Sequence, residues 1–356
     1  MRFDNIPMTK ATEILSILTN ELTAGTYPVD SHFPSEYDLA QRFGISRLTA
    51  NKIVTSLVAS GFLQRGVRGA GTRVLNVARE SQQGRVVFLG SIIHPAEIKS
   101  LQGVLSAAQS NGYSLEIAQP PEQNLKDCLI RLNDDKKVVG IVTISYWRMP
   151  EEYCPRVPVI YVDMPDPLYH PEKHYVATPN LEAFQKMMDG ILERGHREIV
   201  IYTSNNYQYQ HALYRVQGAL EKMREAGIPD VEKRLFVAMD YTEADAVENL
   251  RKILTRYPKT TLIATTSDDL VRTMLKAMKT LEIPYPGQIT LTGFGNITDI
   301  SMMHQIPTVE QNHFQLGVQA CTSLIELYEK RCDSIPNIQY VGYSMVNMNC
   351  IPRVSP

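Results

Sequence analysis

Residues 33–74 read FPSEYDLAQRFGISRLTANKIVTSLVASGFLQRGVRGAGTRV, a stretch that predicts two short helices followed by a hairpin. Ser35, with Asp38 three residues later, is typical of a capping box at a helix start, and Gly44 suits the helix end. Ser46 is placed to cap a second helix, which Gly61 ends. Two short helices joined in this way indicate a helix-turn-helix, whose second helix enters the major groove of DNA.

The glycine-rich end of this stretch, RGVRGAGTR at 65–73, allows two interpretations. A nucleotide-binding glycine loop requires a following helix whose N-terminus faces the phosphates. Gly71 is followed instead by Thr72, Arg73 and Val74, which are residues of strand type. We therefore predict a β-hairpin, or wing, whose tip residue Arg68 enters a groove or contacts the backbone of duplex DNA.

The charge distribution also points to a polyanionic partner. From Leu39 to Arg79 the chain carries seven Lys and Arg residues and no Asp or Glu. Residues 1–78 hold eight basic and six acidic residues, whereas the remainder holds 28 basic and 32 acidic ones. Cations placed on phosphates release condensed counterions, so an acid-free basic run favours nucleic acid. A solvated basic face is the alternative.

The stretch resembles the winged helix-turn-helix of the GntR family of bacterial transcription regulators, over about residues 8–75. The family's Leu-Pro-Ser-Glu, Gly-Val-Ser-Arg and Gly-x-Gly-Thr motifs correspond to 33–36, 44–47 and 69–72. The sequence departs from the family at Tyr37 and Asn51, where arginines are common, although Asn51 is suited to adenine. The residues and the resemblance together give these candidate DNA contacts: Ser35, Glu36, Arg42, Ser46, Arg47, Thr49, Asn51, Lys52, Arg68, Gly69 and Gly71.

From Arg85 onward, short apolar runs alternate with helical patterns. Strand, helix, strand and helix in turn predict parallel sheets with crossover helices. Two such sets, separated near 163–179, indicate an α/β domain of two lobes with a cleft between them. Ligands of open parallel sheets bind beyond the carboxyl ends of the strands, so we expect the effector there.

This part resembles the effector domain of LacI-family repressors, the periplasmic-binding-protein type I fold. Stretches such as LERGHREIVIY, RVQGALEKMREAGIP and PTVEQNHFQLG follow that family's order over most of 85–330. Together with the amino-terminal stretch, they resemble the arabinose-repressor subgroup of GntR regulators. The resemblance implies effector contacts from Asp163, from Arg215 with Gly218, and from Asp269. An arginine fork suits vicinal hydroxyls or a carboxylate.

The departures from this resemblance leave alternatives open. Gly295 stands where the family has an acid, and Asn296 is a neutral substitute. His94 takes the place of aromatic contacts, or it caps or packs. Trp147, which follows Ser145 after a strand, is either a stacking platform for a sugar or ordinary packing. The candidate effector contacts are His94, Ser145, Trp147, Asp163, Arg215, Asp269 and Asn296.

Composition bounds the remaining classes of function. The first 25 residues carry acids and no long apolar run, so we expect a cytoplasmic protein without a signal or membrane span. Five scattered cysteines, with no paired spacing, argue against a metal site or a disulfide framework. We find no nucleophile-base pair and no phosphate loop, and expect no cofactor and no enzyme activity.

We predict a homodimeric repressor that binds operator DNA and a small-molecule effector, which the resemblance implies is a sugar. Its expected parts are a winged domain at 1–75, a linker at 76–84 and a two-lobed effector and dimerisation domain at 85–356. One alternative keeps DNA binding and makes the second domain a dimerisation module with a degenerate pocket. Another is a sugar-modifying enzyme with an accessory DNA domain.

Overall fold

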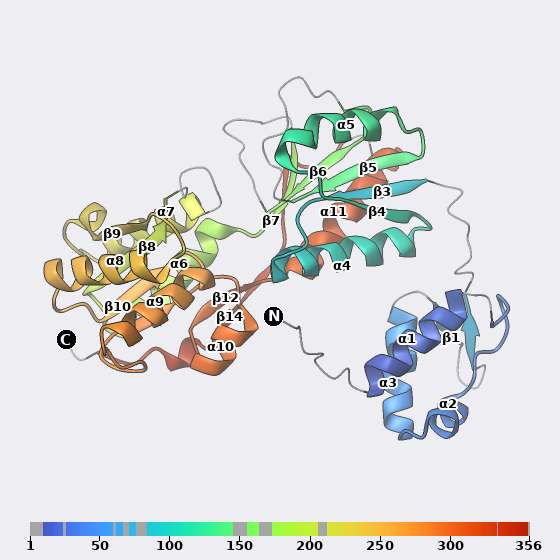
Figure 1. Ribbon diagram of the computed structural model, residues 1–356, viewed down its shortest axis with the longest axis horizontal. Coiled ribbons are helices and arrows are strands. Elements are labelled where there is room, and N and C mark those ends of the chain that lie inside the picture. Colours follow the sequence, from blue (N-terminus) through green and yellow to red (C-terminus); the bar gives the residue numbers. More distant parts are fainter. Residues whose placement is uncertain are drawn as a thin grey trace.

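The computed structural model describes residues 10–23, 26–59, 62–66, 71–75, 84–144, 155–163, 173–205, 212–332 and 334–354. Three parts follow one another in Figure 1: a small amino-terminal unit and two α/β lobes. The predicted tip residues Arg68 and Gly69, the predicted cleft residues Ser145 and Trp147, and all of the predicted linker except Gly84 lie outside the described residues.

The amino-terminal unit consists of helices α1 (Lys10–Thr23), α2 (Glu36–Phe43) and α3 (Arg47–Ala59) and an antiparallel pair of strands, β1 (Leu63–Arg65) and β2 (Thr72–Val74). Leu18, Leu39 and Leu57, each at most 1% exposed, join the helices in one core. This small core fixes α3 against α1 and α2, so the opposite face of α3 is left to solvent.

The local signals in the sequence are confirmed here. Ser35 and Asp38 form the capping box of α2, and Gly44 ends that helix in the left-handed conformation at φ 60°. The Oγ of Ser46 accepts the Thr49 N–H at 3.1 Å at the start of α3. Caps and turns depend on neighbouring residues, which explains why they could be located from sequence alone.

The first lobe is built on a six-stranded parallel sheet in the order β13-β7-β6-β5-β3-β4. Along β3, Val86 and Phe88 face the helices α4 and α11, whereas Val87 and Leu89 face α5. Both faces of the sheet are therefore buried. The elements are β3 (Arg85–Leu89), α4 (Pro95–Ser110), β4 (Ser114–Ala118), α5 (Leu125–Asp134), β5 (Val138–Thr143), β6 (Val159–Val162), β7 (His174–Ala177), α11 (His313–Tyr328) and β13 (Ile338–Tyr340).

The second lobe contains a four-stranded parallel sheet in the order β11-β10-β8-β9. In β8, Ile199 and Ile201 face α6 and α7, and Val200 and Tyr202 face α8 and α9. The elements are α6 (Asn180–Leu192), β8 (Ile199–Ser204), α7 (Ala212–Glu225), β9 (Leu235–Ala238), α8 (Glu243–Arg256), β10 (Leu262–Thr265), α9 (Asp268–Thr280), β11 (Thr290–Thr292) and α10 (Thr298–His304).

The division into two successive sets is wrong in part. Strand β7 falls inside the predicted break at 163–179. It belongs to the first lobe, because its Val176 is fully buried in the core of that lobe. After strand β12 (Thr308–Gln311) the chain also returns to the first lobe to form α11 and β13, and strand β14 (Tyr343–Val346) then pairs antiparallel with β12. The chain therefore passes between the lobes after β7, β12 and β13, which brings distant segments of the chain together where the lobes meet (Figure 1).

Candidate functional site

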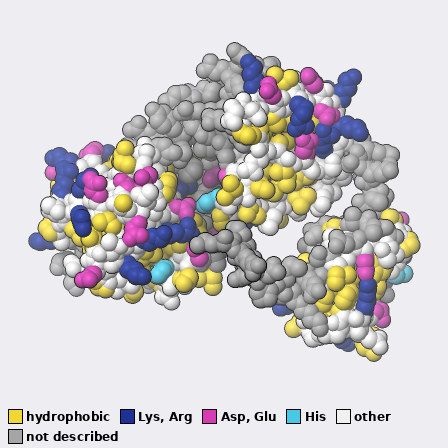
Figure 2. Space-filling model, viewed as in Figure 1, with side chains coloured by type: hydrophobic (Ala, Val, Ile, Leu, Met, Phe, Trp, Pro, Cys, Tyr) yellow, Lys and Arg dark blue, Asp and Glu magenta, His cyan; other side chains and the backbone are white. Residues whose placement is uncertain are grey.

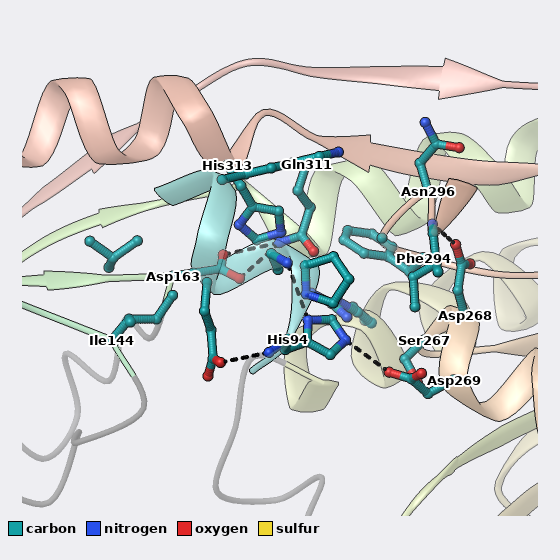
Figure 3. Close-up of a pocket in the computed structure, with 18 of the residues that line it drawn as sticks. His94, Ile144, Asp163, Ser267, Asp268, Asp269, Phe294, Asn296, Gln311 and His313 are labelled. Atoms are coloured by element: carbon teal, nitrogen blue, oxygen red, sulfur yellow. Dashed lines mark hydrogen bonds and ion pairs between the residues drawn. The ribbon is translucent and has the colours of Figure 1, made fainter. Parts of the chain in front are cut away.

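A cavity of about 640 Å³ lies between the two lobes (Figure 3). As expected for parallel sheets, residues beyond the carboxyl ends of strands line it: Ile144 after β5, Asp163 after β6 and Phe294 after β11. His94 and Pro95, at the start of α4, line it from the first lobe, and the start of α9 lines it from the second. The cavity is large enough for a small organic molecule.

Arg215 of α7 lies buried at this cavity and is 2% exposed. Its Nε donates to Asn180 Oδ1 at 2.8 Å, and its Nη1 donates to the Thr266 carbonyl oxygen at 2.7 Å. The guanidinium carbon lies 3.7 Å from the centre of the Phe294 ring. Burial lowers the pKa of Arg215 to about 10, which leaves it charged at neutral pH. Its Nη2 has no hydrogen-bond partner among the described residues, and such a buried donor suits a ligand oxygen.

Asp163 is the second predicted contact at the cavity, and it is 6% exposed. Its backbone takes a left-handed φ of 60°, which is uncommon for a residue other than glycine. Gln311, at the end of β12, donates its Nε2 to both carboxylate oxygens, at 3.1 and 2.9 Å. The sequence alone did not identify Gln311, because 148 residues separate the two partners.

His94 and Asp269, two of the predicted effector contacts, both line the cavity and also contact each other. The His94 ring caps α4, since its Nδ1 accepts the Ala96 N–H at 3.3 Å. Its Nε2 lies 3.2 Å from Asp269 Oδ2 on the opposite lobe, and the other Asp269 oxygen accepts from Arg272 at 2.9 Å. The hydrogen bond from His94 lowers the pKa of Asp269. The two side chains therefore form a contact between the lobes at the cavity, and their direct contact with an effector stays a prediction (Figure 3).

The neighbouring acid, Asp268, is the buried one of the two. It is 1% exposed and accepts hydrogen bonds from the Ile297 N–H at 2.7 Å and from the Thr308 hydroxyl at 2.8 Å. Burial raises the pKa of Asp268 to about 6. This side chain therefore holds the loop after β11 in place, a role that sequence reasoning did not assign to it.

That loop also explains the missing acid. Gly295 has φ +127°, a conformation that a residue with a side chain rarely adopts. Asn296, the predicted neutral substitute, also has a positive φ of 48° and donates its Nδ2 to Glu310 on β12. Its Oδ1 is buried and has no hydrogen-bond partner within the described part of the chain. The amide group of Asn296 is therefore directed to β12, and only its oxygen remains uncommitted.

The predicted DNA contacts divide into free and engaged side chains. Arg47, Asn51 and Lys52 lie exposed on α3, and of these Asn51 is engaged, since its Nδ2 donates to Glu36 Oε1 at 3.5 Å. Thr49 and the capping residues Ser35 and Ser46 instead hold helix starts, the Thr49 hydroxyl lying 2.9 Å from Ser46 Oγ. We expect Arg47 and Lys52 to be available to a partner as they stand, and Asn51 once it releases Glu36.

Arg42 is a correction to the prediction. Its guanidinium is bound by Glu21 of α1, and it also donates to the Tyr27 hydroxyl at 2.8 Å. Glu36 is likewise engaged, with an oxygen 3.6 Å from Arg65 Nη2. Arg42 therefore ties α2 to α1, and we remove it from the set of proposed DNA contacts.

The hairpin is described only at its base. Gly71 is exposed at φ +68°, and a Cβ there would approach the His32 ring at 3.0 Å. The glycine therefore permits both the turn and the close packing of His32, whatever the tip contacts.

Comparisons with known proteins agree with this architecture. Residues 188–347 match the family model of the periplasmic binding protein-like domain. The HTH-type transcriptional regulator IpsA of Corynebacterium glutamicum is 24% identical over 66% of this chain and 70% of its own length. The arabinose metabolism transcriptional repressor of Geobacillus stearothermophilus is 21% identical over 90% of this chain and 91% of its own.

This chain is a transcription regulator. The prediction that it is not an enzyme is confirmed by the same relatives, which are regulators. Among solved structures, the transcriptional regulator CelR-cellobiose complex has a TM-score of 0.63 at 16% identity, covering 88% of this chain and 98% of that one. At this identity the likeness shows the shared fold.

Among the described residues, no helix is both long enough and apolar enough to cross a lipid bilayer. Within the same ranges, no three His, Cys, Asp or Glu side chains gather closely enough to bind a metal ion.

Proposed function

We propose that the regulator is a cytoplasmic repressor whose operator affinity is set by a sugar bound in the cleft between its lobes. The observation that carries this proposal is the buried Arg215, which lines the cavity with Asp163 and whose Nη2 finds no partner among the residues that the structure describes. A guanidinium donor and a carboxylate acceptor together suit the hydroxyls of a sugar, which both accept and donate. The structural neighbour that holds cellobiose supports the same class of ligand.

The DNA-binding unit we propose is a winged helix-turn-helix of the GntR type, at residues 1–75. The antiparallel pair β1 and β2 directly after α3 supports it, because such a hairpin is what a wing requires. The proposed base and phosphate contacts come from Arg47, Asn51 and Lys52 on the exposed face of α3, and from Arg68 in the wing. Residues 76–84 would then connect lobe movement to the positions of the two wings.

A homodimer is the proposed partner arrangement, since two wings would occupy two operator half-sites. The support is an apolar surface on one side of both lobes, where Ile93, Ile98 and Leu105 lie on or beside α4 and Met302 and Met303 lie on α10. Figure 2 shows hydrophobic side chains gathered over this side. Apolar patches of this kind mark association sites.

A second function is favoured by Gly295. If the loss of the family's acid there has left the pocket unable to bind, the lobes serve only to dimerise the regulator. Thermal shift of the full chain against neutral mono- and disaccharides separates the two proposals. A saturable shift that Arg215→Lys abolishes supports the sensor, because lysine keeps the charge and lacks the second guanidinium nitrogen. Absence of a shift for every sugar supports the dimerisation module.

A further inference from the structure

His313 is a buried histidine that the functions argued so far do not use. It is the first residue of α11, it is 5% exposed, and it lines the cavity near Gln311 and Asp163 (Figure 3). Its Nδ1 has no hydrogen-bond partner among the described residues. Leaving a buried polar atom unpaired costs about 1–3 kcal/mol, so most such atoms in folded proteins find a partner.

The protonation state of His313 narrows the kind of partner. Burial lowers the pKa of His313, and the charges facing it are of both signs: Asp163 and Glu310 oppose Arg215 and Lys99. The ring is therefore neutral at neutral pH, with one nitrogen that donates and one that accepts. Its partner has to be a group that tolerates either role.

The charges around the cavity narrow the kind of partner that His313 can have further. Arg215 Nη2 needs an acceptor, whereas Asp163 can only accept, and both line the same cavity as His313. Asp268 and Asp269 line it as well, so acidic side chains outnumber the buried guanidinium. An anionic ligand would satisfy Arg215 and be repelled by these carboxylates. A hydroxyl satisfies all three kinds of group.

We propose that His313 is a specificity-determining residue of the effector site, where its ring reads one hydroxyl of a neutral polyhydroxylated effector held by Arg215. This inference rests on the proposed function, since it assumes that the cleft binds a ligand. His313 enters the cavity from the start of α11, which belongs to the first lobe, whereas Arg215 belongs to the second. One ligand in contact with both joins the lobes.

The test uses isothermal titration calorimetry on the full chain with L-arabinose, D-ribose, D-glucose and cellobiose, and with D-glucuronate and glucose 6-phosphate as charged probes. The variant His313→Phe keeps a buried ring and removes both nitrogens. The control His196→Phe changes another buried histidine, whose nitrogens are bonded to Thr261 Oγ1 at 2.8 Å and the Pro352 carbonyl at 3.1 Å. That residue does not line the cavity.

We expect a neutral sugar to bind, His313→Phe to raise its Kd about tenfold or more, and His196→Phe to leave it unchanged. Monodeoxy derivatives of that sugar, each lacking one hydroxyl, identify the hydroxyl that His313 contacts. One derivative should bind the wild type more weakly than the parent sugar does. The variant His313→Phe should bind that derivative and the parent sugar equally well. If His313→Phe does not fold, His313→Asn replaces it and should change the ranking of the deoxy sugars.

The outcomes separate the two proposals. Equal sugar affinities in wild type and variant, within about twofold, overturn the role of His313 and leave the sensor intact. Binding of only the charged probes overturns the neutral class of ligand. Binding of none of the probes overturns the proposed sugar-responsive function together with this inference.

Discussion

The buried carboxyl of Asp268 makes the stability of the second lobe depend on pH in a direction opposite to acid denaturation. Burial raises its pKa from 3.8 to about 6. A difference of one in pKa corresponds to about 1.4 kcal/mol, so the two values correspond to about 3 kcal/mol. Because the folded state binds this proton more tightly than the unfolded state, the stabilisation is present below about pH 4 and is lost as the pH rises through about 6.

The variant Asp268→Asn is neutral at every pH and keeps an oxygen to accept the Ile297 N–H. Relative to wild type, its free energy of unfolding should therefore rise by about 3 kcal/mol between pH 4 and pH 7. Scanning calorimetry of the full chain measures this as a pH-dependent difference in Tm, of about 6–12 °C for a lobe of this size.

The comparison with wild type cancels the titration of all other groups, which dominates acid unfolding of either protein. Asp127→Asn, on the exposed side of α5, controls for the loss of one surface charge. A difference between wild type and Asp268→Asn that is flat with pH, or that grows toward acid, would refute the assignment of Asp268 as a buried acid with a raised pKa.

Three further variants test separate contacts. Gly317→Ala places a Cβ 2.0 Å from a main-chain oxygen of α4, so in a thermal melt it should lower the stability by about 1–3 kcal/mol or more. The control Gly342→Ala, whose Cβ would have no atom within 4 Å, should lower it little. Equal melting temperatures of the two variants would refute the close packing of the helices. Arg47→Ala should weaken DNA binding by about 1–3 kcal/mol in fluorescence anisotropy. Arg42→Ala should leave DNA binding unchanged and lower the Tm of the amino-terminal unit. The reverse pattern would contradict the structural role that we give to Arg42. Asp269→Asn should weaken the contact between the lobes and raise the Kd of a bound sugar by a few fold at unchanged stoichiometry. Complete loss of sugar binding would indicate instead that Asp269 contacts the effector directly.

The sequence predicted the features that depend on neighbouring residues. The capping box at Ser35 and the left-handed Gly44 involve partners within four residues, and the alternation of strands and helices is a local periodicity. Arg42 and Arg47 are chemically alike and five residues apart, yet among the described residues Arg42 has an ion-pair partner and Arg47 has none. Its partner Glu21 lies 21 residues away, on another helix, so no local pattern reveals it.

The cleft was predicted in outline and only partly in its residues. Placing the site beyond the carboxyl ends of the strands depended on topology alone, whereas the family resemblance selected Asp163, Arg215 and Asp269, all of which line the cavity. The contact of His94 with Asp269 spans 175 residues and became visible only once the lobes were folded. Asp268 and Asp269 are adjacent in sequence and face opposite environments, a difference set by the loop after β11.

The return of α11 to the first lobe is the largest feature that the sequence did not predict. Its apolar residues are those of any buried helix, so composition could not say which core they join. That crossing carries His313 to the cavity, and a site residue was therefore missed for a topological reason.

The central claim is that sugar binding in the cleft changes the regulator's affinity for DNA. The direct measurement is fluorescence anisotropy of the full chain, at one fixed salt concentration, on a duplex from upstream of its own gene, with and without a saturating neutral sugar found by thermal shift. We predict that the sugar changes the Kd for this duplex about 5- to 150-fold, as coupling of 1–3 kcal/mol requires. An unchanged Kd at saturating sugar would contradict the account.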